Sequence, residues 1–186
     1  YVGNVALLDI EDGDIEAVEA EGRTSIDVDK FVFGGRLGLI PCPYSEVCVS
    51  LATGKAAGED ELSATRDYDV YGADFGYKWR NLGLRSEYIT QKVGSSSQSV
   101  APGSARWDAW YAQAAYRFMP TRFEGVVRYA DYDANLDESD QKQWALGVNY
   151  LFAPNAMAKL AYNFNDGESG STADDDGFQV QFTYGF

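Results

Sequence analysis

The chain ends with the stretch DGFQVQFTYGF (176–186), in which every second residue is apolar or aromatic. Polar or small residues occupy the positions between them. This period of two predicts a β-strand with one apolar face and one polar face. The apolar face contacts either a protein core or lipid, and the rest of the sequence has to decide between the two. Its members are Phe178, Val180, Phe182, Tyr184 and Phe186.

Nine other segments alternate in the same manner, and the connections between successive segments are short and long in turn. Asp, Glu, Gly and Ser in the long connections indicate turns and solvated loops. Short periplasmic turns and long external loops are typical of outer-membrane β-barrels, whose strands also need about ten residues. Residues 14–22 are interpreted as part of the first long loop, 9–29. The ten predicted strands are 1–8, 30–40, 45–54, 68–79, 82–91, 107–118, 122–132, 143–152, 156–164 and 177–186.

The composition excludes several classes of protein and site. No apolar run of about 18 residues occurs, so we expect no transmembrane helix, whereas alternating barrel strands escape that test. The chain has no histidine, which removes histidine-based catalytic triads and histidine metal sites. Carboxylates are so frequent in the loops that no pair stands out as a catalytic dyad. We therefore expect no enzyme, no cofactor, no metal site and no nucleic-acid partner.

The net charge of -14 belongs mainly to the loops. Counted with their flanking residues as 9–29, 54–69, 92–106, 131–142 and 165–177, the five long loops hold 24 of the 29 acidic residues, whereas the rest of the chain has a small excess of bases. The loops 9–29 and 165–176 offer oxygen ligands for divalent cations, but no spacing in them matches a calcium loop. We therefore interpret them as solvated loops whose charges repel one another.

Two features favour lipid over a soluble core. Aromatic side chains gather near the short turns, as in the girdle of a barrel at a membrane interface. Glycines inside the strands weaken a sheet and suit the crowded, curved interior of a barrel. The sequence thus predicts an all-β, antiparallel, up-and-down transmembrane β-barrel with 1–186 as one domain, and a soluble β-protein is the weaker hypothesis. The aromatic residues are Trp79, Tyr116, Phe118, Phe123, Tyr150, Phe152, Tyr184 and Phe186.

The polar face of the predicted strands carries charges of both signs. In one hypothesis its cations attract anions and set the selectivity of a water-filled pore. In the other they pair with the carboxylates and fill a narrow interior, which is favoured if ten strands close alone. The predicted pore-lining residues are Arg36, Lys78, Arg85, Arg128, Lys159, Asp74, Glu87 and Glu124.

The chain has two cysteines, Cys42 and Cys48, at the ends of the stretch CPYSEVC (42–48). Because the periplasm is oxidising, we expect a small disulfide between them that clips this hairpin and has no catalytic role. The parity of its strand directs Cys48 toward the lumen.

Several stretches resemble known outer-membrane proteins. The terminal Phe186, preceded by Tyr184 and Phe182, looks like the C-terminal signal that the barrel assembly machinery recognises. The stretches FGGRLGLIP (33–41), YGADFGYKWRNLGLRSEYI (71–89) and QWALGVNYLFAPNAMAKLAYNF (143–164) resemble the C-terminal half of Gram-negative porins. The likeness is greatest to the phosphate-selective (O/P-type) porins. Their lysine-rich constriction has no matching positions here, so the phosphate preference is not carried over.

The resemblance has consequences for size, location and partners. Porins of this class have about 16 to 18 strands, so the chain is either a small closed barrel or the C-terminal part of a larger one. The resemblance implies a place in the bacterial outer membrane, contact with lipid and lipopolysaccharide, and assembly as a homotrimer. Counting strands from the short-turn rule places both termini in the periplasm.

We therefore expect a porin through which small hydrophilic solutes or ions diffuse passively, with a weak preference for anions. The alternative is a non-conducting outer-membrane barrel that acts as a scaffold or sheath for a partner protein.

Overall fold

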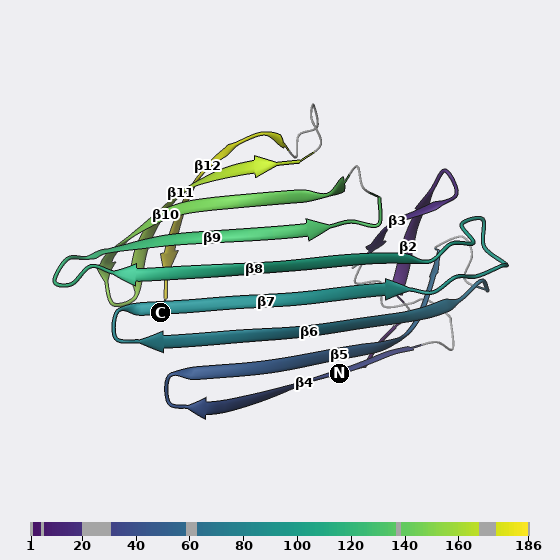
Figure 1. The fold of residues 1–186 in the computed structure, drawn as a ribbon, viewed down its shortest axis with the longest axis horizontal. Coiled ribbons are helices and arrows are strands. Elements are labelled where there is room, and N and C mark those ends of the chain that lie inside the picture. The colour runs from purple at the N-terminus through teal and green to yellow at the C-terminus, as the bar shows by residue number, and fades with distance from the viewer. Residues whose placement is uncertain are drawn as a thin grey trace.

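The structure is a computed structural model that describes residues 2–4, 6–19, 31–58, 63–136, 139–167 and 174–185. Its elements are strands of one sheet, and the main path runs in the order β1-β4-β5-β6-β7-β8-β9-β10-β11-β12 (Figure 1). No helix in this part of the chain is long and apolar enough to cross a membrane. The strands are β1 (Val2–Asn4), β2 (Ala6–Glu11), β3 (Asp14–Glu19), β4 (Phe31–Cys42), β5 (Ser45–Gly58), β6 (Arg66–Trp79), β7 (Leu82–Val93), β8 (Ala105–Arg117), β9 (Phe123–Asp133), β10 (Gln141–Ala153), β11 (Ala156–Asp166) and β12 (Gly177–Tyr184).

From β4 to β12 the chain forms an antiparallel meander, in which each strand pairs with the next. The predicted strands from 30–40 onward are confirmed, and the short turns lie where the sequence places them. Several strands extend further into the long connections than predicted. In β5 and β6 the ladder continues through the pair Lys55 and Asp67, whose Nζ and Oδ1 atoms lie 2.5 Å apart. The all-β, antiparallel, up-and-down fold class is therefore confirmed.

The prediction for the N-terminal region is wrong in two respects. Residues 1–8 do not form one strand, because β1 pairs with the loop end of β4 and the chain then continues into a separate strand, β2. Residues 14–19, expected in a loop, form β3, which pairs with β2. Asp12 and Gly13 close this hairpin with positive φ angles of 50° and 88°. Such angles at both central residues match the twist of two paired strands, and Asp-Gly is their sequence signal.

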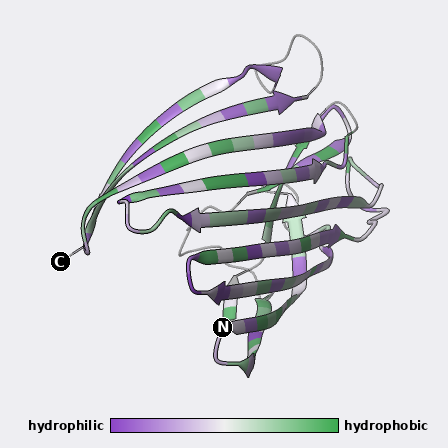
Figure 2. Cartoon of the chain, turned by 60° about the vertical axis from the view of Figure 1, so that its left-hand side comes forward, coloured by the Kyte–Doolittle hydropathy of each residue, from purple (hydrophilic) through white to green (hydrophobic). Residues whose placement is uncertain are grey.

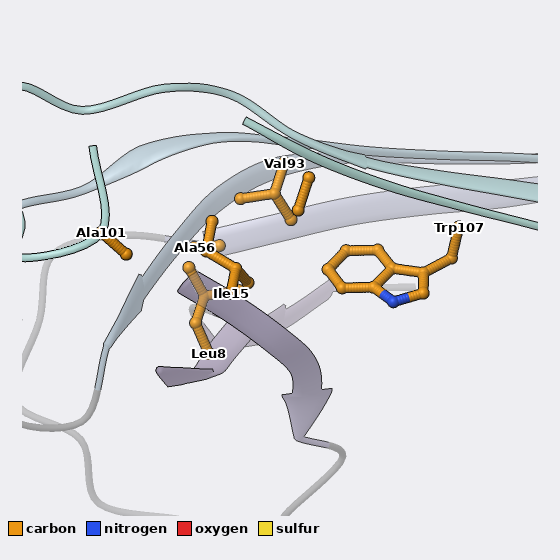
Figure 3. Packing of buried hydrophobic residues seen from close by; sticks show 7 residues of the cluster. Leu8, Ile15, Ala56, Val93, Ala101 and Trp107 are labelled. Atoms are coloured by element: carbon orange, nitrogen blue, oxygen red, sulfur yellow. The ribbon is translucent and has the colours of Figure 1, made fainter. Parts of the chain in front are cut away.

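This N-terminal hairpin (residues 6–19) packs at the loop end of the sheet (Figure 1). β2 pairs in parallel with the end of β5, where Leu8 lies opposite Gly58. Leu8 and Ile15 are both 3% exposed and pack into a small hydrophobic cluster with Trp107 (Figure 3). Burying each of the two aliphatic side chains stabilises the docked hairpin by about 1.5–3 kcal/mol. The cluster comprises Leu8, Ile15, Ala56, Val93, Ala101, Ala105 and Trp107.

Away from this cluster, burial is the reverse of that in a soluble protein. Hydrophobic and hydrophilic residues alternate along the strands (Figure 2). On β10 the apolar residues Trp144 and Leu146 are 53% and 51% exposed, whereas their neighbours Gln143 and Ala145 are half-buried. Large exposed apolar patches mark surfaces that contact a partner or a membrane. The apolar face of this sheet therefore lacks a protein core in the described part of the chain.

The sheet is an open, curved wall in the residues described. β10, β11 and β12 curve away from the plane of the preceding strands (Figures 1 and 2). Within the described residues β1 pairs only with β4 and β12 pairs only with β11, so these two strands form the edges.

Candidate pore wall

The ladder register assigns each residue of the meander to one of two faces, because residues directly opposite each other point to the same side of a sheet. One row of partners runs from Glu46 through Gly76, Arg85 and Gln113 to Arg128. We call the side that carries this row the polar face. The opposite side, which carries the exposed apolar residues, is the apolar face.

All eight residues predicted to line a pore lie on the polar face. Asp74 is opposite Cys48 on one side and Glu87 on the other, while Lys78 is opposite Gly83. On the remaining strands, two amide residues of the polar face lie opposite predicted residues in the ladder. Gln113 is opposite Arg128, and Asn149 is opposite both Glu124 and Lys159. The full set is Arg36, Asp74, Lys78, Arg85, Glu87, Glu124, Arg128 and Lys159.

The structure distinguishes between the two hypotheses for these charges. Nη2 of Arg36 donates to both carboxylate oxygens of Asp74 at 2.8 Å, so this pair follows the ion-paired hypothesis. Its side chains are 59% and 28% exposed, and an ion pair of that exposure contributes at most about 1 kcal/mol. The other four cations, Lys78, Arg85, Arg128 and Lys159, form no ion pair with the residues that the structure describes.

Arg128 has a partner other than a carboxylate. Its guanidinium carbon lies 4.1 Å from the centre of the Tyr111 ring, which is a cation–π contact. Tyr111 and Arg128 lie on the adjacent strands β8 and β9 and are diagonal neighbours on the polar face, because Tyr111 is opposite Ala130, two residues after Arg128. Nearby, Nδ2 of Asn149 donates to Glu124 Oε1 at 2.8 Å. The carboxylate of Glu124 is thus held by an amide.

The predicted disulfide between Cys42 and Cys48 is not formed. Cys42 is opposite Ser45, and Cys48 lies three residues further along β5. That spacing is about 10 Å along a strand, whereas a disulfide requires Cα atoms within about 7 Å. Each thiol has a polar neighbour instead: Cys42 Sγ lies 3.2 Å from Ser45 Oγ, and Cys48 Sγ lies 3.3 Å from a Glu46 carboxylate oxygen. As predicted, Cys48 belongs to the polar face.

The N-terminal hairpin adds acidic groups at the loop end of the polar face. Its docking cluster uses Val93 and Trp107, which share the polar face of β7 and β8. Asn135 also holds it, because Nδ2 of Asn135 donates to the carbonyl of Ile15 at 3.0 Å. The exposed acidic residues of the hairpin are Asp9, Glu11, Asp12, Asp14 and Glu16. Desolvation, followed by the charges of its acidic neighbours, raises the pKa of Glu16.

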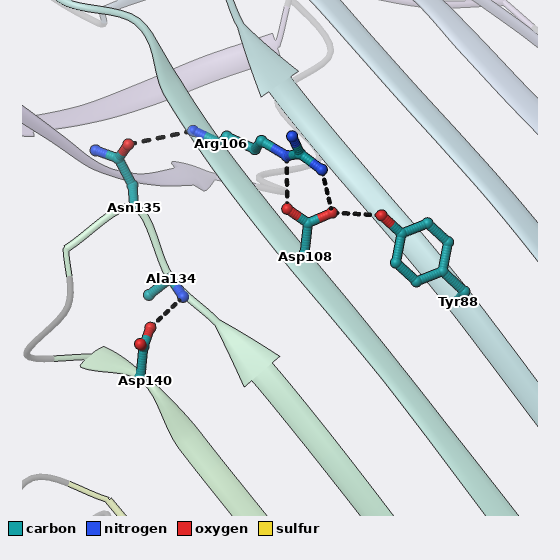
Figure 4. Close-up of polar contacts among 6 residues, drawn as sticks. All are labelled: Tyr88, Arg106, Asp108, Ala134, Asn135 and Asp140. Atoms are coloured by element: carbon teal, nitrogen blue, oxygen red, sulfur yellow. Dashed lines mark hydrogen bonds and ion pairs between the residues drawn. The ribbon is translucent and has the colours of Figure 1, made fainter.

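A polar network at the same end braces β7, β8 and the segment before β10 (Figure 4). Nε of Arg106 donates to Asp108 at 2.6 Å, and the Tyr88 hydroxyl donates to the same carboxylate at 2.5 Å. Asn135 Oδ1 accepts from the backbone amide of Arg106 at 3.1 Å, so one side chain ties β8 to the hairpin. Sequence reasoning missed this network, because it joins the Arg106–Asp108 pair to residues that lie 20 and 29 positions away in the chain.

The apolar face has two groups of aromatic contacts, one toward each end of the strands. Near the short turns, the rings of Phe123 and Tyr150 lie 4.9 Å apart. Toward the loops, the rings of Tyr129 and Trp144 also lie 4.9 Å apart. Trp144 and Tyr150 are six positions apart on β10, which corresponds to about 20 Å of strand. This approaches the height of about 25 Å expected for the apolar band of a membrane barrel.

Two of the three residues predicted as an assembly signal lie on the last strand. Phe182 and Tyr184 belong to the apolar face of β12 and are 75% and 69% exposed. Phe186 lies outside the described residues. A recognition role for these three residues stays a prediction.

Comparison with known proteins agrees with this geometry. A family model described as Gram-negative porin matches residues 47–186. No curated protein matches the chain. The match concerns porins in general, and the phosphate-selective subfamily stays a prediction. The chain therefore belongs to the family of Gram-negative porins, which are β-barrel channel proteins of the outer membrane.

Proposed function

We propose that the polar face of this sheet is the wall of a water-filled pore for passive diffusion of small hydrophilic solutes and ions. The observation that carries the proposal is the pairing of two opposite surfaces on one sheet. Large apolar side chains are exposed on one side, and charged and amide side chains occupy the other. Because hydrocarbon covers only the first side at low cost, water belongs on the second.

We further propose a weak preference for anions, set by cations of the wall that lack carboxylate partners. Lys78, Arg85, Arg128 and Lys159 form no ion pair within the described residues. The acidic N-terminal hairpin opposes them from the loop end. A unit charge at about 8 Å in water changes the energy of a passing ion by about 0.5 kcal/mol, or its local concentration about twofold. Selectivity thus depends on a small difference between the attraction of anions by the wall cations and their repulsion by the acidic hairpin.

The surroundings of the protein follow from the same proposal. Exposed rings at both ends of the apolar face suit the lipid and lipopolysaccharide interfaces of the outer membrane. The short-turn end of the sheet and the end of β12 beside it lie in the periplasm, and the exposed side chains Phe182 and Tyr184 of β12 contact the barrel assembly machinery. From the likeness to the porin family we also expect the protein to assemble as a homotrimer.

Reconstitution of the protein into a planar bilayer tests this function. We expect discrete unitary conductance steps, and a reversal potential in a potassium chloride gradient that indicates a small excess of chloride permeability. A protein that inserts but produces no steps would contradict the pore. It would support the alternative of a non-conducting barrel that serves as a scaffold or sheath.

A further inference from the structure

The polar face differs in chemistry between its two halves. On β4 to β7 it carries carboxylates next to cations, as in the pair of Arg36 with Asp74. On β8 to β12 amide side chains dominate, and Glu124 is held by Asn149. A hollow of about 380 Å³ lies on this second half, and we call it the amide basin. Its amide side chains are Gln113, Gln143, Asn149, Asn163, Gln179 and Gln181.

The floor of the amide basin is made of small residues. Ala145, Gly147 and Ala161 line it, and Gly147 is directly opposite Ala161 in the ladder. A Cβ atom added at Gly147 would lie 3.2 Å from the Leu160 carbonyl and 3.7 Å from the Ala161 Cβ. The hollow thus exists because long side chains surround a patch of wall that is nearly bare backbone.

Two cations complete the lining. Arg128 and Lys159 both border the amide basin, and neither forms an ion pair with a described residue. The Nε atom of Arg128 is buried and has no hydrogen-bond partner among the described residues. Among the described residues that line the basin there is no carboxylate and no aromatic ring. Recognition there rests on positive charge and hydrogen bonds rather than on ring stacking.

We infer that the amide basin is a binding subsite for small polyhydroxy carboxylates. The two cations attract a carboxylate group and donate to it. Each amide both donates and accepts hydrogen bonds, which is what a hydroxyl group requires. A ligand that carries both groups matches both kinds of side chain in the lining, the cations and the amides, whereas a simple fatty acid or a neutral polyol matches only one kind. The subsite rests on the proposed function, because it places the basin in the path of the solute.

Calorimetric titration of the detergent-solubilised protein tests this inference with three probes: gluconate, sorbitol and hexanoate. Gluconate has both chemical groups, sorbitol lacks the carboxylate and hexanoate lacks the hydroxyls. We expect gluconate to bind at least tenfold more tightly than either of the others. Sorbitol lacks the charged group, whose hydrogen bonds are the strong ones, and hexanoate leaves the amides without hydroxyl partners. Equal affinity of the three probes, or the absence of gluconate binding, would overturn the inference.

Matched variants locate the site. Lys159→Gln should weaken gluconate binding about tenfold, whereas Lys78→Gln removes the same charge from the polar face outside the basin and should change it less than twofold. Gln179→Met, which keeps the shape but removes the amide, should weaken gluconate and leave hexanoate unchanged. Equal effects of the two lysine variants would mean a general attraction of anions and would refute the subsite.

The same protein in a planar bilayer separates this inference from the proposed function. Conductance without gluconate binding would refute the subsite and keep the pore. Gluconate binding without conductance would keep the basin as a binding site and refute the pore.

Discussion

Single residues differ in how closely their neighbours enclose them, and the two cysteines show this most simply. Cys42 is exposed beside Ser45 at the short turn, whereas Cys48 is 2% exposed. The sequence placed Cys48 on the polar face correctly but paired it with Cys42. A count of residues between two cysteines does not show that the ladder register separates them by about 10 Å.

The free thiols give a direct prediction. A water-soluble maleimide should modify one cysteine per chain in the folded protein without prior reduction, and Cys42→Ser should abolish that modification. After unfolding, both thiols of the native chain should react. Mass spectrometry measures the number of adducts. Zero adducts on the unfolded, unreduced protein would indicate the disulfide that the structure excludes.

The N-terminal hairpin is the element that shapes the loop end of the wall. It is held by the cluster around Leu8 and Ile15, by parallel pairing with β5 and by the contact of Asn135 with the Ile15 carbonyl. None of these contacts is local. Sequence reasoning therefore found the meander, whose hairpins are adjacent in the chain, and missed the hairpin, whose docking partners lie some 50 to 120 residues away.

The Asp12-Gly13 pair shows that the hairpin could in part have been predicted from the sequence. An Asp-Gly pair between short apolar segments is a strong signal for a two-residue hairpin, but the dense acidic residues around it favoured a loop. The wall residues were easier to place, because a period of two assigns Arg85 or Lys159 to a face without any tertiary information. The amide basin, in contrast, depends on the side-by-side arrangement of strands β8 to β12 and has no signature within one segment.

Loosening the hairpin should widen the pore. Leu8→Ala should cost about 2–5 kcal/mol of docking free energy, because it leaves a cavity in the cluster. We expect higher and noisier unitary conductance and faster proteolysis within 6–19. Leu37→Ala, at a position 64% exposed on the apolar face, is the control and should leave both readouts unchanged. Unchanged conductance of the Leu8 variant would show that the hairpin does not restrict the path.

At the scale of the whole molecule, the proposed pore makes the sheet a boundary between two solvents, lipid and water. Trp144 on the apolar face is 53% exposed, whereas Trp107 beneath the hairpin is 7% exposed. In a soluble protein the first would contact water, and in a membrane barrel it contacts lipid. In the same proposal the charged side chains of the polar face contact water. The selectivity between anions and cations then depends on all of these charges together.

Fluorescence quenching by brominated lipid distinguishes these environments. In vesicles, a variant that keeps only Trp144 should be strongly quenched, and a variant that keeps only Trp107 should be quenched little. Equal quenching of both would contradict the assignment of the apolar face to lipid.

Selectivity should depend on pH through the hairpin. The raised pKa of Glu16 means that this carboxyl binds a proton at a higher pH than an ordinary glutamate does. The charged form of Glu16 is disfavoured in the docked hairpin, so acidification removes this negative charge at a higher pH than it would from an ordinary glutamate. We expect the chloride preference to rise as the pH falls through that raised pKa. Glu16→Gln should show the higher preference already at neutral pH. A variant without this effect would exclude Glu16 from the pH response.

The central claim is that the polar face, and not the apolar face, lines the conducting path. Single cysteines in a Cys42→Ser, Cys48→Ser background test it directly, with Gln143→Cys on the polar face and its neighbour Trp144→Cys on the apolar face. A charged, water-soluble thiol reagent applied during a bilayer recording should change the unitary conductance of the Gln143→Cys variant and leave that of the Trp144→Cys variant unchanged. A change at Trp144→Cys alone, or no change at either position, would contradict the account.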